Sequence, residues 1–88
     1  MSSTERVVKV LFFGAIREAV GVGEVEVEIP ANRSLRTVVA MVMQEYAAKL
    51  TQFHREAYVV ALNKQICKND ALLEANDEIA IFPPVTGG

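Results

Sequence analysis

The sequence predicts an α+β fold in which a mixed sheet of about five strands packs over one main helix. The chain has 88 residues, of which 51% are hydrophobic and 23% are charged. This length suits one small domain spanning residues 1–88, and this composition is typical of globular rather than disordered chains. Five short segments have the apolar or alternating pattern of strands, and one longer segment has helical periodicity.

The first segment, Val7–Phe13, consists almost entirely of β-branched, aliphatic and aromatic residues and predicts a central strand. Side chains alternate across a sheet, so its even-numbered and odd-numbered residues lie on opposite faces. Lys9 marks the odd-numbered face as the solvated one. If the helix covers the even-numbered face, Leu11 and Phe13 are exposed apolar groups that a partner can contact.

The next segments lead into the main helix. Ala15–Val20 predicts a short helical turn, and the strict alternation of Glu24–Ile29 predicts a half-buried strand that Pro30 terminates. Ser34 is a good N-cap, and the helix is expected to extend from there to about Ala48. Its apolar face follows the i, i+3, i+4, i+7 spacing and comprises Leu35, Val38, Val39, Val42 and Tyr46.

Three further strands are expected, at Ala57–Leu62, Gln65–Cys67 and Ile79–Phe82. Asn63-Lys64 and Asn76-Asp77 are turn-forming pairs, and Leu72 and Leu73 predict one helical turn that closes the edge of the core. The order strand, strand, helix, strand, short strand, strand describes a β-grasp, the ubiquitin-like fold. The alternative is a ferredoxin-like arrangement, which requires two comparable helices.

Charge and composition exclude several functions. Nine Lys and Arg against eleven Asp and Glu give a net charge of −2 without a basic cluster, so nucleic acid is not an expected ligand. The single cysteine and the lack of an apolar run of about 18 residues predict a cytoplasmic chain that does not enter a membrane. The last twenty residues contain no Lys or Arg, and their acidic residues are Asp70, Glu74, Asp77 and Glu78. They indicate a solvated acidic surface or, alternatively, a docking site for a basic partner.

No self-contained catalytic or metal site is expected. His54 has no second histidine or carboxylate pair nearby and is interpreted as a surface residue. Cys67 is interpreted as a small buried hydrophobe rather than a redox or sulfur-carrying thiol. No Gly-rich loop opens a helix, so the chain has no cradle for nucleotide phosphates, and we expect it to bind no cofactor.

The C-terminal tail, residues 83–88, is the most informative segment. Pro83-Pro84 lacks backbone N–H groups and favours an extended course, so the last strand must stop at Phe82. At roughly 3.1 to 3.3 Å per residue, the tail can project about 20 Å. Gly87-Gly88 carries no Cβ atoms, so it can pass a narrow channel and present the terminal carboxylate to another protein. Once activated as an acyl adenylate, that carboxylate can accept a sulfur or an amine nucleophile.

Three stretches carry a family resemblance: the ending Phe82-Pro83-Pro84-Val85-Thr86-Gly87-Gly88, the preceding Asp77-Glu78-Ile79-Ala80, and the opening Lys9-Val10-Leu11-Phe12-Phe13 with Ile16-Arg17-Glu18. They resemble the MoaD group of β-grasp sulfur carriers, the small subunits of molybdopterin synthase. The similarity extends from Val7 to Gly88, and the Pro-Pro-Val-x-Gly-Gly ending is its most specific part. Asn76, where the family usually has Gly, and Thr86, often Ser or Ala, are the departures.

The resemblance implies a reaction and a set of partners. Gly88, preceded by Gly87, would be adenylated by an E1-like adenylyltransferase that uses ATP, and converted to a thiocarboxylate. The tail would then enter the active site of the large synthase subunit, in a heterotetramer of two small and two large subunits. There it would donate sulfur to cyclic pyranopterin monophosphate to form the molybdopterin dithiolene. The implied partner interface comprises Phe13, Ile66, Phe82, Pro83, Pro84, Val85 and Thr86.

Three alternatives remain open. A Gly-Gly terminus would serve equally in a ubiquitin-like modifier, whose Gly88 forms isopeptide bonds with target lysines. It would also serve in a thiamin-type sulfur carrier. A bare interaction domain with an idle tail is the third alternative, and it predicts that deletion of Gly88 leaves activity intact.

Overall fold

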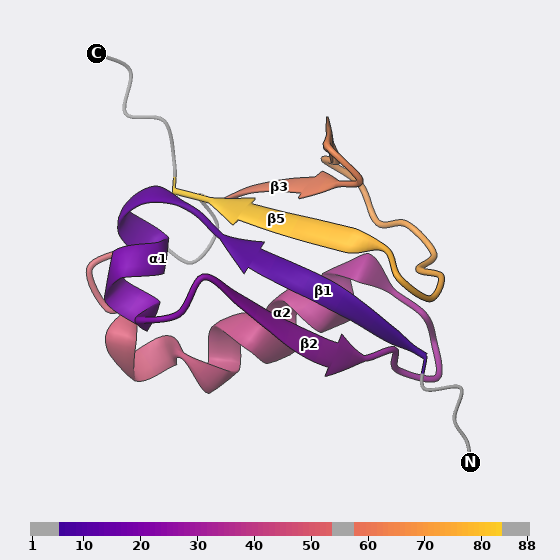
Figure 1. Ribbon diagram of the computed structural model, residues 1–88, viewed down its shortest axis with the longest axis horizontal. Helices are drawn as coiled ribbons and strands as arrows, with labels where there is room; N and C mark the ends of the chain where they lie inside the picture. Colours follow the sequence, from indigo (N-terminus) through magenta and orange to yellow (C-terminus); the bar gives the residue numbers. More distant parts are fainter. Residues whose placement is uncertain (1–5, 54–57, 84–88) are drawn as a thin grey trace.

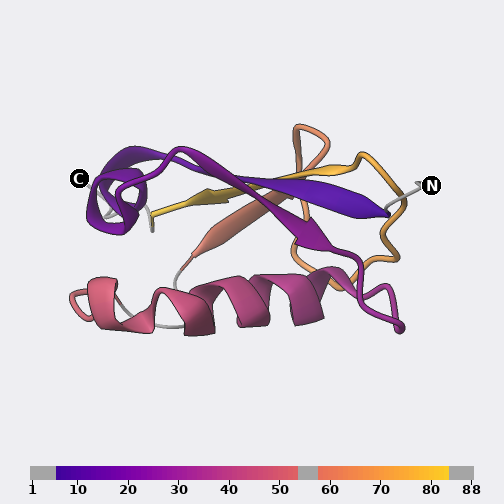
Figure 2. The same cartoon turned by 60° about the horizontal axis from the view of Figure 1, so that its bottom comes forward.

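The structure, a computed structural model, describes residues 6–53 and 58–83. The elements in chain order are β1 (Val7–Phe12), α1 (Gly14–Val20), β2 (Glu24–Glu28), α2 (Leu35–Glu45), the 3-10 helix η1 (Ala47–Lys49), β3 (Val59–Leu62), β4 (Gln65–Ile66) and β5 (Glu78–Phe82). The strands form one mixed sheet with α2 packed on one face (Figure 1, Figure 2). The predicted β-grasp is therefore confirmed.

The sheet has the strand order β2-β1-β5-β3-β4. The central strands β1 and β5 are parallel, whereas the other neighbouring strands are antiparallel. Asn63 and Lys64, the predicted turn between β3 and β4, have φ angles of 50° and 72°. Positive φ at both central residues gives a hairpin turn whose twist matches that of the strands. This topology excludes the ferredoxin-like alternative, and it brings the ends of β1 and β5 together.

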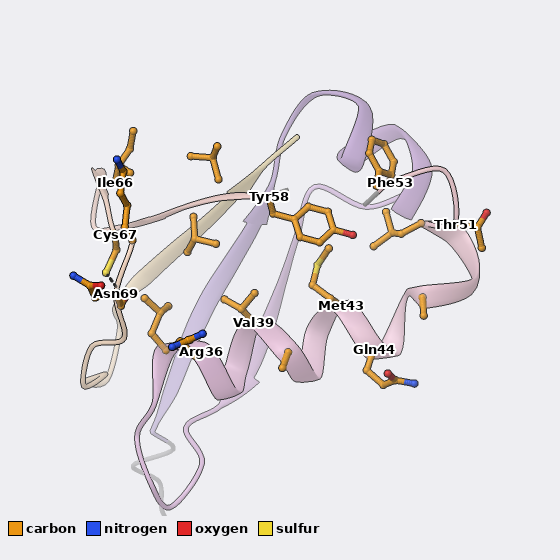
Figure 3. Close-up of a pocket in the computed structure, with 17 residues that line it drawn as sticks. Arg36, Val39, Met43, Gln44, Thr51, Phe53, Tyr58, Ile66, Cys67 and Asn69 are labelled. Carbon is orange, nitrogen blue, oxygen red and sulfur yellow. Dashed lines mark hydrogen bonds between the residues drawn. The ribbon is translucent and has the colours of Figure 1, made fainter. Parts of the chain in front are cut away.

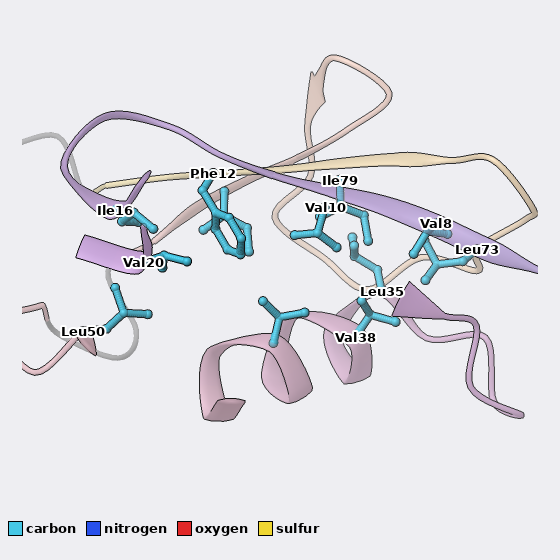
Figure 4. Packing of buried hydrophobic residues seen from close by; sticks show 12 residues of the cluster. Val8, Val10, Phe12, Ile16, Val20, Leu35, Val38, Leu50, Leu73 and Ile79 are labelled. Atoms are coloured by element: carbon cyan, nitrogen blue, oxygen red, sulfur yellow. The ribbon is translucent and has the colours of Figure 1, made fainter. Parts of the chain in front are cut away.

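The core lies between the sheet and α2. The even-numbered residues of β1 are at most 1% exposed, as the alternation predicts. They face the apolar side of α2 (Figure 4), and full burial of such a side chain contributes about 1.5–3 kcal/mol. The remaining core residues come from α1, α2, β5 and two loop positions, and comprise Ile16, Val20, Leu35, Val38, Val42, Leu50, Leu73, Ile79 and Ile81.

The start of α2 follows the prediction, but its end does not. The Ser34 hydroxyl accepts a hydrogen bond from the backbone N–H of Thr37 at 3.1 Å, as an N-cap does. The helix ends at Glu45 rather than near Ala48, because Tyr46 leaves the helical conformation at φ −103°, ψ 18°. The chain then tightens into η1, which is followed by Leu50, buried at 4% exposure.

The helical turn predicted at Leu72 and Leu73 is wrong. The backbone N–H of Leu73 donates to the carbonyl of Arg33 at 2.8 Å, and Leu72 forms an isolated bridge with Ser34. These hydrogen bonds between distant parts of the chain hold the segment extended, so successive side chains point to opposite sides. Leu73 is fully buried and Leu72 is 67% exposed, which means that one leucine, not a helix, closes the core edge.

Each strand also differs from its prediction at one end. β1 ends at Phe12 rather than Phe13, β2 ends at Glu28 rather than Ile29, and β5 begins at Glu78 rather than Ile79. β4 ends at Ile66, so Cys67 lies outside it, and β3 begins at Val59. The predicted start at Ala57 lies outside the described residues. No helix in the described part of the chain is long and apolar enough to cross a membrane.

Candidate functional site at the base of the C-terminal tail

The parallel pairing of β1 and β5 places two phenylalanines in contact directly before the tail. Phe12 pairs with Ile81, and the Phe13 N–H donates to the Ile81 carbonyl at 3.1 Å. Phe13 therefore lies beside Phe82. Their rings stack with centroids 4.7 Å apart and an interplanar angle of 13°. Phe13 is 37% exposed, so this aromatic pair is accessible to a partner.

Pro83, the first residue of the tail, packs against Gly14. Gly14 has φ +59°, in the left-handed region that favours glycine. A Cβ atom added there would lie 3.2 Å from Cγ and 3.3 Å from Cδ of the Pro83 ring, closer than side chains normally approach. The Pro83 ring can pack this closely because Gly14 has no side chain. This contact and the ring stack together determine where the tail leaves the domain.

An apolar strip crosses the outer face of the sheet beside the aromatic pair. Leu11 pairs with Ala80, Ala80 with Ala61, and Ala61 with Ile66. Directly opposite residues project to the same face. The two alanines are short, and Ile66 at the edge is 66% exposed. The outer face therefore carries a low apolar shelf between the Phe13–Phe82 pair and Ile66.

The structure brings only some of the predicted interface residues together. Phe13, Phe82 and Pro83 form one contiguous group, and Ile66 lies on the same face at the far edge of the sheet. Residues 84–88, including Gly87 and Gly88, lie outside the described residues. Sequence reasoning missed Ala61 and the role of Gly14. The alternation of β3 could have indicated Ala61, but no local signal identifies Gly14, because its neighbour Pro83 is far along the chain.

Charged residues replace apolar ones farther from the tail. On the outer face, Lys9 pairs with Glu78 on one side and with Glu26 on the other. The Lys9 Nζ lies 3.8 Å from Oε2 of Glu24, and both side chains are about half exposed, at 46% and 55%. Such exposed ion pairs contribute little stability. The apolar shelf thus has a charged, mostly acidic border on the side away from the tail.

Two of the four acids near the C-terminus have structural roles, which corrects the interpretation of a merely solvated acidic surface. Asp70 Oδ1 accepts from the backbone N–H of Arg36 at 3.0 Å, and the Ser34 hydroxyl donates to Oδ2 at 2.8 Å. The Arg36 N–H, followed by the Ser34 hydroxyl, lowers the pKa of Asp70 from its ordinary value. Asp77 accepts from the Asn63 side-chain amide at 3.0 Å and so joins two turns.

The described residues provide no metal site. No group of three His, Cys, Asp or Glu side chains among residues 6–53 and 58–83 could hold a metal ion. Cys67 is half-buried rather than buried, and its Sγ donates to the Asn69 carbonyl at 3.1 Å. The prediction of a small core residue is therefore only partly right, because Cys67 lines a groove. His54 lies outside the described residues.

Comparison with known proteins places these features in a family context. The model of the ThiS family matches residues 10–88. The molybdopterin synthase sulfur carrier subunit of Escherichia coli (strain K12) is 37% identical over 83 residues, covering 92% of this chain and 99% of that protein. A chain in the complex of subunits 1 and 2 of molybdopterin-converting factor from Helicobacter pylori has a TM-score of 0.65 and 29% identity, covering 93% of this chain and 99% of that one. SAMP1 from Haloferax volcanii has a TM-score of 0.76 at 22% identity, with the same coverage, and shares the fold.

Proposed function

Since this chain belongs to the ThiS family, we propose that it is the sulfur-carrier subunit of molybdopterin synthase. The observation that carries the proposal is the base of the tail. There Pro83 packs on Gly14 beside the exposed Phe13–Phe82 pair, so the tail begins next to an apolar surface that can dock on a partner. A tail that must enter a partner's active site requires such a defined starting point.

The reactive group in this proposal is the carboxylate of Gly88. A carboxylate is a poor electrophile, so the E1-like adenylyltransferase first joins it to AMP from ATP and releases pyrophosphate. A sulfur nucleophile then attacks the carbonyl carbon and AMP leaves, which gives a thiocarboxylate. Gly87 and Gly88 leave that carbonyl unhindered. No cofactor is needed on this chain for either step, and the sequence indicates a cytoplasmic reaction.

The proposed acceptor is cyclic pyranopterin monophosphate, held by the large synthase subunit. The apolar shelf with Phe13, Phe82 and Ile66 would dock on that subunit, while Pro84, Val85 and Thr86 would lie inside the channel through which the tail reaches the active site. Burial of an aromatic pair at the centre of an interface is a common source of binding energy. Two sulfur transfers complete one dithiolene, and a heterotetramer of two small and two large subunits provides two tails.

Intact mass spectrometry tests the proposed chemistry. The protein is incubated with ATP, a sulfur source and its activating enzyme, with a variant lacking Gly88 in parallel. We expect a mass gain of one oxygen-to-sulfur exchange in the full chain and none in the variant, with unchanged thermal unfolding of both. Lysine-linked conjugates without any thiocarboxylate would instead assign the chain to the ubiquitin-like modifiers. Normal dithiolene synthesis by the deletion variant would show that the tail is idle.

A further inference from the structure

A groove of about 1000 Å³ lies between α2 and the β3–β4 edge, on the side of the sheet that faces the helix (Figure 3). This is the upper end of the size range of ligand pockets, about 300–1000 Å³. Its apolar lining includes Val39, Met43, Leu50, Phe53, Tyr58 and Val60. It shares Ile66 with the edge of the apolar shelf but opens on the side of the sheet that faces the helix, and the proposed sulfur transfer does not require it.

One end of the groove is cationic. Among the described residues that line it, Arg36 and Lys68 are the only charged ones. Neither forms an ion pair within the described part of the chain, where the Lys9–Glu24 contact is the single pair found. Asp70 lies beside Arg36, and its negative charge offsets part of the positive charge there, so Arg36 and Lys68 together still outweigh this single carboxylate. The groove therefore suits an apolar segment that ends in an anion.

The chain itself contains such a segment. Residues 84–88 begin with Pro84 and Val85 and end in the carboxylate of Gly88, which is ionised at neutral pH. We propose that the groove binds the C-terminal tail of a second copy of this chain. Pro84 and Val85 contact the apolar floor, and the carboxylate pairs with Arg36 and Lys68.

The tail of the same copy is too short for this contact. β5 ends over the C-terminal end of α2, whereas Arg36 is in the first turn of that helix (Figure 2). The tail would have to cross from the sheet to the helix layer, about 10 Å, and run back along about 14 Å of helix. Even the straight line between the two points is about 17 Å and passes through the packed core, so a path around the surface is longer than that. Residues 84–88 span at most about 17 Å when fully extended. The contact is therefore intermolecular.

Such a contact joins copies head to tail. One copy supplies its tail and the next supplies its groove, so the interface is heterologous and can extend to further copies. The consequence goes beyond the proposed function: at high concentration, a docked tail is withheld from the activating enzyme. The unmodified carboxylate is sufficient for the contact, and sulfur chemistry is not required.

A tail peptide provides the direct test. The ¹⁵N-labelled full chain is titrated with the peptide Pro-Pro-Val-Thr-Gly-Gly as the free acid and, as a control, with its C-terminal amide. We expect shifts of backbone resonances around Val39, Met43 and Cys67, and binding of the amide that is roughly tenfold weaker. Equal binding of both peptides, shifts confined to the outer face around Leu11 and Phe13, or no binding would overturn the proposal.

Variants connect the groove to self-association. The double variant Arg36→Gln with Lys68→Gln should bind the free acid roughly tenfold more weakly, whereas Lys64→Gln, which removes an exposed cation outside the groove, should bind as the parent does. Sedimentation velocity of the full chain should show concentration-dependent association that disappears when residues 84–88 are removed. Association that survives this truncation would contradict the proposal, and this result is independent of any sulfur-transfer assay.

Discussion

Replacement of Gly14 by alanine should impair the functions of the C-terminal tail. It should destabilise the fold no more than Gly21→Ala, the same change at another glycine with positive φ. Gly14 and Gly21 both have positive φ, at 59° and 93°, so alanine is strained at either position. They differ in surroundings: a Cβ at Gly14 meets the Pro83 ring at 3.2 Å, whereas nothing lies within 4 Å of a Cβ at Gly21. Gly21→Ala is therefore a matched control for Gly14→Ala.

The expected magnitudes follow from this geometry. Left-handed backbone costs an L-residue about 1–2 kcal/mol, which for a domain of this size lowers the melting temperature by roughly 4–8 °C per kcal/mol. Both variants should show this loss of stability. In Gly14→Ala the Pro83 ring must also shift by a few tenths of an ångström, and that shift changes the direction of the tail. Since a misplacement of 1 Å can cost about 100-fold in rate, we expect a decrease of about threefold to tenfold.

The assay compares the two variants in three measurements: thermal unfolding, the rate of thiocarboxylate formation, and affinity for the large subunit. Gly14→Ala should be impaired in the second and third, and Gly21→Ala should retain both near the parent's values. If both variants support the same rate and affinity, the contact between Gly14 and Pro83 does not direct the tail, and the reasoning is refuted.

The remaining predictions concern docking, pH dependence and the core. Phe82→Glu should weaken affinity for the large subunit at least roughly tenfold by isothermal titration calorimetry, because a charge replaces half of the aromatic pair, while Val22→Glu, at an exposed position in the loop before β2, should not. Unchanged binding by a folded Phe82→Glu protein would contradict the proposed surface. Asp70→Asn should lower the melting temperature at neutral pH. Because folding lowers the pKa of Asp70, the parent protein should be more stable than the variant above about pH 4. This difference in stability should be lost as the pH falls through the lowered pKa. Melting curves from pH 7 to pH 2 would contradict this if the difference stayed constant. In urea unfolding, Leu73→Ala should lower the free energy of unfolding by about 2–5 kcal/mol, because Leu73 is fully buried. Leu72→Ala should lower it by less than about 0.5 kcal/mol, because Leu72 is 67% exposed. Equal losses would argue against the extended conformation of this segment.

Much of the fold was predictable because local rules sufficed. The alternation in β1 correctly separated Phe12, which faces the core, from Phe13, because the side-chain period of a strand is set by the backbone alone. The N-cap at Ser34 was also predictable, since a hydroxyl that bonds the third N–H acts within one turn. Leu72 and Leu73 were mispredicted because their backbone groups bond to Arg33 and Ser34, about 40 positions away in the chain.

The sequence by itself determined the order of the elements, the apolar faces and the Pro-Pro-Val-Thr-Gly-Gly ending, since each of these is a property of neighbouring residues. Only the tertiary structure decided how the tail begins. Gly14 and Pro83 meet because β1 and β5 pair in parallel at the centre of the sheet, and no pattern near either residue specifies that pairing. The groove between α2 and β3 likewise arises from how a helix lies across a sheet edge, where Arg36 and Lys68, 32 positions apart in the sequence, line the same surface.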